Sequence, residues 1–107
     1  MELYNLIYIS KILELSTHVI REWLKFGYIS AIIPPKGFGS SIKFNAENIY
    51  NIALFEELLM CGFYRKNAAK ILKGIDWSKE TYSCVLASKA EVTINLAKIK
   101  KGVNFYL

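Results

Sequence analysis

The stretch STHVIREWLKFG, residues 16–27, predicts an amphipathic helix with a defined beginning and end. Ser16 suits the N-cap, because its hydroxyl can accept a hydrogen bond from a backbone N–H that the first helical turn leaves unpaired. Gly27 suits the end, where a residue that tolerates positive φ is favoured. Apolar residues share one face at helical spacing: Val19, Ile20, Trp23 and Leu24. Polar residues share the opposite face: Thr17, His18, Arg21, Glu22 and Lys25.

A second short helix is predicted immediately upstream, over about residues 6–12, with Asn5 as its N-cap. Residues 13–15 then form a three-residue turn between the two helices. Two short helices joined by so tight a turn are typical of a helix-turn-helix, and the second helix directs arginine, histidine and lysine outward.

The order of the residues around this pair resembles the N-terminal domain of the MerR family, a winged helix-turn-helix. An aromatic residue followed by a strand-to-helix start matches Tyr4 and residues 5–6. The recognition helix of the family has an arginine, an aromatic residue and a glycine at the spacing of Arg21, Trp23 and Gly27. Its wing contains proline and ends in an aromatic residue, which matches Pro34, Pro35 and Phe44.

The resemblance continues through a third helix that ends in Gly62-Phe63 and a short fourth helix at residues 68–72, so it covers about residues 4–73. The chain departs from the family pattern at Glu14, where the family usually has glycine, and at Ile42, where the wing often has arginine. An αL conformation at Glu14 would carry strain. The long helix through which family members dimerise is not evident in the sequence.

The remaining elements are predicted from the positions of Pro, Gly and Asn, which mark turns and helix ends, and from the spacing of apolar residues between them. Residues 28–33 and 42–44 predict two wing strands around the turn PPKGFGSS, residues 34–41. Asn45 is expected to cap a third helix that ends at Gly62, and residues 65–73 a fourth.

Beyond residue 80 the apolar pattern alternates, which predicts a small antiparallel sheet over residues 81–107. Its turns are expected near residues 89–90 and 101–102. A helix over residues 90–100 is the alternative, because Val92, Leu96 and Ile99 also fit helical spacing. The expected fold is therefore α+β and mainly α, with residues 1–75 as a winged helix-turn-helix of about four helices and residues 76–107 as a C-terminal β extension.

Composition agrees with a small cytoplasmic protein of 107 residues and net charge +5. No apolar run is long enough to span a bilayer, and the start of the chain lacks the pattern of a signal peptide. Cys61 and Cys84 are expected to be reduced, mostly buried thiols. We expect no enzyme activity, cofactor or metal site, because no catalytic or ligand-binding motif stands out. No small-molecule effector is evident from the sequence.

These observations predict a double-stranded DNA-binding protein that regulates transcription. The residues expected to face the bases in the major groove are Thr17, His18, Arg21 and Glu22. Those expected to contact phosphates are Lys11, Lys25, Lys36, Ser40 and Lys43.

Several alternatives stay open at this stage. Arg21 could pair with Glu14 or Glu22 on a solvated face. The chain could also be a protein–protein adaptor that keeps the winged fold, or an excisionase-like factor that bends DNA. A homodimer is expected through the apolar face of Val92, Ile94 and Leu96, unless that face folds back onto the helices.

Overall fold

The computed structural model describes residues 2–36, 41–86 and 90–107. The elements follow in the order β1 (Tyr4–Asn5), α1 (Leu6–Leu13), α2 (Thr17–Lys25), β2 (Lys43–Phe44), α3 (Ala46–Met60), α4 (Arg65–Lys73), β3 (Thr81–Leu86), β4 (Ala90–Asn95) and α5 (Leu96–Asn104). The α+β class is confirmed. Within the described residues there are five helices, one more than predicted, and two antiparallel sheets of two strands each.

The predicted pair of helices at the N-terminus is confirmed, together with both caps. Asn5 Oδ1 accepts a hydrogen bond from the backbone N–H of Tyr8 at 2.8 Å. Ser16 Oγ accepts one from the N–H of Val19 at 3.1 Å. Glu14 ends α1 with a φ of 55°, so the turn takes the αL conformation in spite of its side chain. Gly27 follows α2 with a φ of 76°, as its position after the helix predicts.

The first predicted wing strand, residues 28–33, is wrong. Only Ile33 pairs there, through an isolated bridge to Lys43, and β2 pairs instead with β1, with Tyr4 opposite Phe44. One physical reason is that the residues before Ile33 are held against α3. The Tyr28 ring stacks on the ring of Phe55 with the centroids 5.6 Å apart, and Asn48 Oδ1 accepts the N–H of Ile32 at 2.9 Å. Four residues of the predicted wing turn, 37–40, lie outside the described residues.

The two helices that follow are confirmed. Asn45 and Asn48 form a reciprocal capping box at the start of α3, each accepting the backbone N–H of the other. Gly62 stops the chain from continuing the helix, with a φ of 97°. The fourth helix has the predicted bounds of residues 65–73. Cys61 at the end of α3 is exposed, so the prediction that it is buried is wrong.

A β-hairpin of β3 and β4 confirms the first part of the predicted C-terminal sheet. Its cross-strand pairs place apolar residues on one face and polar residues on the other. The apolar face contains the pairs Tyr82 with Ile94 and Cys84 with Val92. The expected turn near residues 89–90 lies partly outside the described residues.

The last predicted strand is wrong, because residues 96–104 form the helix α5. The predicted turn at residues 101–102 is wrong for the same reason. Asn95 ends β4 and caps α5, its Oδ1 accepting the N–H of Lys98 at 3.0 Å. From there Leu96, Ile99 and Val103 fall on one helical face against the core.

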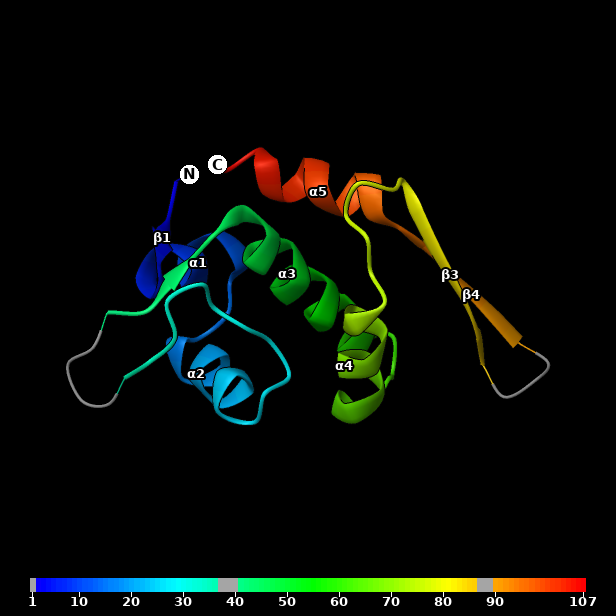
Figure 1. Cartoon of the computed structure of the whole chain (residues 1–107), viewed down its shortest axis with the longest axis horizontal. Coiled ribbons are helices and arrows are strands. Elements are labelled where there is room, and N and C mark those ends of the chain that lie inside the picture. Colours follow the sequence, from blue (N-terminus) through cyan, green and yellow to red (C-terminus); the bar gives the residue numbers. More distant parts are fainter. Residues whose placement is uncertain (1, 37–40, 87–89) are drawn as a thin grey trace.

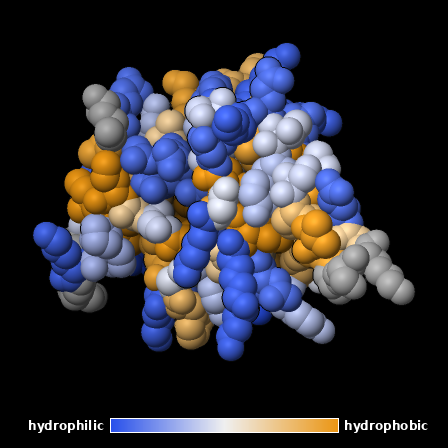
Figure 2. Space-filling view, turned by 45° about the vertical axis from the view of Figure 1, so that its right-hand side comes forward, coloured by the Kyte–Doolittle hydropathy of each residue, from blue (hydrophilic) through white to orange (hydrophobic). Residues whose placement is uncertain are grey.

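The long helix α3 lies at the centre of the molecule, with other helices on both sides of it (Figure 1). In that view α2 and α4 lie along the lower edge, α5 and both termini along the upper edge, and the β3–β4 hairpin projects at one end. Mostly hydrophilic side chains extend from the lower edge (Figure 2). The two faces of α3 therefore carry different helices, α2 and α4 below and α5 above.

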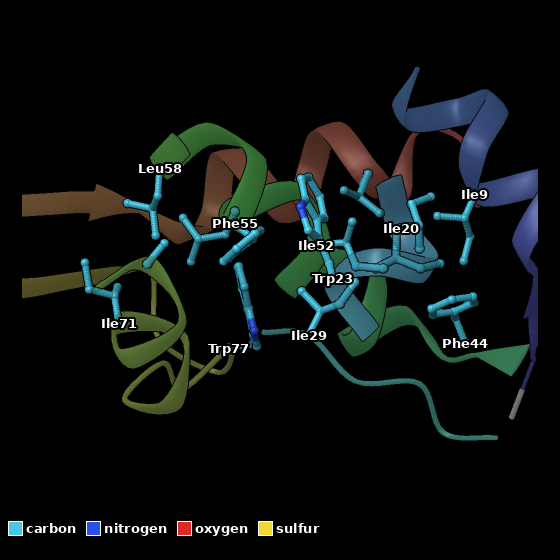
Figure 3. Close-up of a cluster of buried hydrophobic side chains, with 14 of the residues drawn as sticks. Ile9, Ile20, Trp23, Ile29, Phe44, Ile52, Phe55, Leu58, Ile71 and Trp77 are labelled. Atoms are coloured by element: carbon cyan, nitrogen blue, oxygen red, sulfur yellow. The ribbon is translucent and has the colours of Figure 1, made fainter. Parts of the chain in front are cut away.

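The hydrophobic core is a continuous row of side chains around α3, from Ile71 near α4 to Phe44 near the β1–β2 sheet (Figure 3). The C-terminal part of the chain contributes directly to it. Its core residues include Trp77, Ile94, Leu96 and Val103, none more than 8% exposed. Two of the three residues of the expected dimer face, Ile94 and Leu96, are therefore buried within one chain.

Candidate nucleic-acid interface

Helix α2 is held in place by its inner face. Ile20 is fully buried, and Trp23 is 6% exposed. The Trp23 ring meets the ring of Phe55 on α3 edge to face, with the centroids 4.8 Å apart. The prediction that Trp23 is a core residue is confirmed. Because two bulky side chains anchor the helix, its outer face has a fixed orientation.

The outer face of α2 presents the residues that the sequence singles out. The side chains of His18, Arg21, Glu22 and Lys25 are exposed, and Thr17 at the start of the helix is half-buried. His18 Nε2 lies 3.7 Å from Glu22 Oε1, one turn along the helix. Such an exposed pair stabilises a helix only slightly, so both groups stay available to a partner.

The alternative in which Arg21 pairs with an acidic neighbour is wrong. Within the described residues, neither Glu14 nor Glu22 comes within 4.0 Å of the Arg21 guanidinium as an ion pair. Glu22 approaches His18 instead. Arg21 therefore points its five N–H donors away from the core with no carboxylate on them.

The other predicted phosphate contacts lie on elements flanking α2. Lys11 is exposed on α1, and Lys36 is exposed in the segment before residue 37. Lys43 is half-buried in β2, where its backbone pairs with Ile33 in both directions at 3.0 and 3.1 Å. Ser40, the remaining predicted contact, lies outside the described residues. The position that is often arginine in the MerR wing holds Ile42, which is 4% exposed and belongs to the core.

Arg65 is a residue of this face that the sequence analysis missed. It begins α4 and lines a hollow of about 430 Å³ together with residues of α2 and the following loop, including His18, Glu22 and Phe26. Tertiary structure thus extends the basic face from α2 to α4, which are 40 residues apart from Lys25 to Arg65.

Three further lysines lie on α4, and one of them, Lys70, lines a hollow with residues of β3 and not of α2. Lys66, Lys70 and Lys73 are exposed and follow a helical i, i+4, i+7 spacing, while Ala68 and Ile71 are buried on the other side. This spacing was visible in RKNAAKILK, residues 65–73, and could have marked a basic helix face. Figure 2 shows the hydrophilic side chains that extend from this edge of the molecule.

Acidic side chains gather elsewhere. Burial raises the pKa of Glu56, and the neighbouring carboxylates of Glu57 and Glu14 raise it further. Glu57 lines a groove with residues of α5, not the hollow beside α2. Glu14, Glu56 and Glu57 therefore form an acidic cluster, whereas the hollow beside α2 holds Glu22 together with His18 and Arg65.

Other kinds of site find little support in the parts of the chain that the structure describes. Over residues 2–36, 41–86 and 90–107, no three His, Cys, Asp or Glu side chains gather closely enough to hold a metal ion. The helices of these segments are also too short or too polar to cross a membrane. The basic face of α2 and α4 is the arrangement that points most clearly to a partner.

No protein-family model and no curated protein matches the chain. The resemblance to the MerR family therefore stays a prediction that rests on the order of the residues quoted above.

Proposed function

We propose that this chain is a winged helix-turn-helix protein that binds double-stranded DNA and regulates transcription. The observation that carries the proposal is α2 itself. Ile20 and Trp23 fix the helix against α3, and its opposite face presents exposed His18, Arg21 and Lys25. A capped helix with a buried inner face and a basic outer face is what the major groove of B-DNA accommodates.

The proposal assigns two kinds of contact. Base edges would be read by the residues at the start and middle of α2: Thr17, His18, Arg21 and Glu22. Phosphates would be met by residues on α1, on α2 and in the wing: Lys11, Lys25, Lys36, Ser40 and Lys43. The structure supports adding Arg65 to the second group, because Arg65 lines the hollow beside His18 and Glu22. Phosphate contacts set affinity and register, and base contacts set sequence preference.

The test is a titration of duplex DNA at several salt concentrations. With about four to six phosphates neutralised, the plot of log affinity against log salt should have a slope of roughly −4 to −5. Changing Lys25 or Arg65 to Ala should weaken all sequences alike and flatten the slope by about one unit for each lost contact. Changing His18 to Ala should alter sequence preference with little effect on the slope.

The matched control is Lys101→Ala, an exposed lysine of α5 on the opposite side of α3. It removes the same charge but should leave the slope unchanged. If no duplex bound at low ionic strength, or if Lys101→Ala weakened binding as much as Lys25→Ala, the proposal would fail. Gel mobility of circularly permuted fragments would show whether binding bends the duplex, as an excisionase-like factor would.

A protein–protein adaptor is the second function to consider, because large apolar side chains also lie near this face. Phe26 at the end of α2 is 60% exposed, and Tyr64 before α4 is 80% exposed. Exposed aromatic residues are typical anchors in protein interfaces. Changing Phe26 to Ser separates the two functions: DNA affinity should persist if α2 reads DNA, while an adaptor would lose its partner.

A further inference from the structure

A second surface of the molecule is an apolar groove on the α5 side of α3. It has a volume of about 630 Å³ and is lined by residues of α1, α3, β4 and α5. Buried residues of the core, Leu54, Leu58 and Val103, contribute to its lining together with the partly buried Leu13 and Ile99. Apolar side chains gathered in a hollow of this kind form a candidate contact surface for a partner.

Gly102 marks the place where a partner could come closest. It lies inside α5 and lines the groove. No atom lies within 4 Å of the point where a Cβ on Gly102 would sit. Glycine is a poor helix former, and nothing within the described chain requires the absence of a side chain here. A bare stretch of helix backbone facing an open groove permits close approach of a second helix.

The charges along the groove are self-complementary. Glu57 from α3 and Lys98 from α5 both line it, and both are exposed. Among the described residues the two are not joined by an ion pair. Glu56 lies close to Glu57 and to Glu14, because the carboxylates of both residues raise its pKa. The three residues together make the surroundings of Glu57 more negative. A two-fold axis would bring Glu57 of one copy opposite Lys98 of the other, and Lys98 of the first copy opposite Glu57 of the second. The same surface on two copies can therefore form two ion pairs.

The apolar surface continues beyond the groove to the two chain ends. Tyr106 lines the groove, is 52% exposed, and accepts a hydrogen bond at its backbone oxygen from the hydroxyl of Tyr8. Ile7 on the same helix as Tyr8 is 63% exposed. Exposed apolar side chains of α1 and of the C-terminal residues therefore lie close to the groove as well as within it.

We propose that a second copy of this chain occupies the groove through a two-fold axis, with α5 against α5 at Gly102 and with Glu57 facing Lys98 of the partner subunit. Val92 and Ile94 of the strand face expected from the sequence also line this groove, and α5 adds Lys98 and Gly102 to it. The interface leaves α2 and α4 free, so the assignment does not depend on the proposed DNA binding. Each copy would present its α2 on the side away from the interface.

Sedimentation equilibrium of the full chain, from about 1 to 100 μM, tests the assignment. We expect a reversible dimer. Gly102→Leu fills the groove while replacing a poor helix former, so it should weaken dimerisation at least tenfold without lowering the melting temperature. The matched control is Ala97→Leu, an exposed position of α5 that does not line the groove. It should leave the dimer intact.

Charge reversal provides an independent test of the two-fold arrangement. Glu57→Lys and Lys98→Glu should each weaken the dimer, because each places like charges opposite one another in both halves of the interface. An equimolar mixture of the two variants should associate again, since every facing pair is then opposite in sign. A monomer at 100 μM, a dimer that persists in Gly102→Leu, or a mixture that fails to associate would overturn the assignment. Binding of a fluorescent apolar dye to a chain that stays monomeric would overturn it too.

Discussion

Glu14 holds a backbone conformation that its side chain does not favour. Its φ of 55° lies in the αL region, where a Cβ crowds the following carbonyl group. The tight connection between α1 and α2 imposes this conformation, because the backbone N–H of Leu15 must reach the carbonyl of Ser10 at 3.1 Å. Part of the stability of the helix pair therefore offsets strain at one residue.

Glycine at this position should stabilise the protein relative to alanine. Glu14→Gly and Glu14→Ala both remove the carboxylate, and only the glycine variant also removes the Cβ. We expect the glycine variant to be more stable than the alanine variant by about 1 kcal/mol, measured as the free energy of unfolding in urea. Equal stabilities would show that the turn carries no strain.

Glu56 gives the folded protein a dependence on pH. Burial and the neighbouring Glu57 and Glu14 raise its pKa in the folded state above the ordinary 4.5. A carboxyl with a raised pKa binds a proton more tightly in the folded state than in the unfolded state. Its ionised form therefore destabilises the folded protein, and this cost in stability is largest at neutral pH. The penalty decreases as pH falls through the raised pKa and is absent below about pH 4.5.

Glu56→Gln should therefore be more stable than the natural sequence at pH 7, and the difference should vanish below pH 4.5. Thermal melts over this pH range would measure it. The control is Glu47→Gln, in the first turn of the same helix. There a negative charge interacts favourably with the helix N-terminus, so its loss should destabilise by about 0.3–1 kcal/mol at pH 7. The same sign for both variants would contradict the assignment of Glu56.

The change from β4 to α5 takes place at a single residue. Residues 92–96 alternate as a strand should, and Leu96, Ile99 and Val103 also repeat as a helix should. Local pattern alone does not separate these two possibilities. Asn95 favours the helix through its side-chain cap, and α3 favours it by covering the apolar face of α5.

Removing the cap should loosen α5 in particular. Asn95→Ala should cost about 1 kcal/mol of stability, whereas Asn95→Asp keeps an acceptor for the N–H of Lys98 and should cost little. Hydrogen exchange of the α5 amides, together with thermal melts, would measure both effects. A cost shared equally by the two variants would show that Asn95 does not stabilise α5 by capping it.

The core joins the two ends of the chain into one structure. Leu96 from α5 is fully buried and belongs to the same hydrophobic cluster as Leu54 and Phe55 from α3. Trp77 adds to the same cluster and donates its Nε1–H to Asn51 Oδ1 at 2.8 Å. The residues after position 75 therefore belong to the same hydrophobic core that holds the inner face of α2 in place.

Truncating a core side chain in α5 should destabilise the whole protein. Leu96→Ala leaves a cavity and should cost about 2–5 kcal/mol. Met60→Ala, at a position that is 74% exposed, should change stability by less than about 0.5 kcal/mol. A single unfolding transition, shifted as a whole in Leu96→Ala, is the expected result in urea. An independent early transition of the tail would contradict a shared core.

Sequence determined most of the first half of this protein. Asn5, Ser16 and Asn45 cap helices through contacts with residues three positions away, so their effect is readable without knowing the fold. Gly27 and Gly62 end helices for a reason that is equally local, since positive φ suits glycine. The outer face of α2 followed in the same way, because helical spacing alone separates Trp23 from Arg21.

Tertiary structure decided what depends on contacts between distant residues. The loop at residues 28–33 forms no strand because Tyr28 and Ile32 are held against α3, through the ring of Phe55 and the side chain of Asn48. The strand β2 pairs instead with β1 from the start of the chain. Residues 96–104 form a helix because helical spacing lets Leu96, Ile99 and Val103 pack together against the core around α3. Arg65 joins the basic face only once α4 packs near α2. The structure of these segments depends on the free energy gained when residues that are far apart in the sequence bury apolar surface against each other. A local sequence pattern does not reveal the size of that free energy.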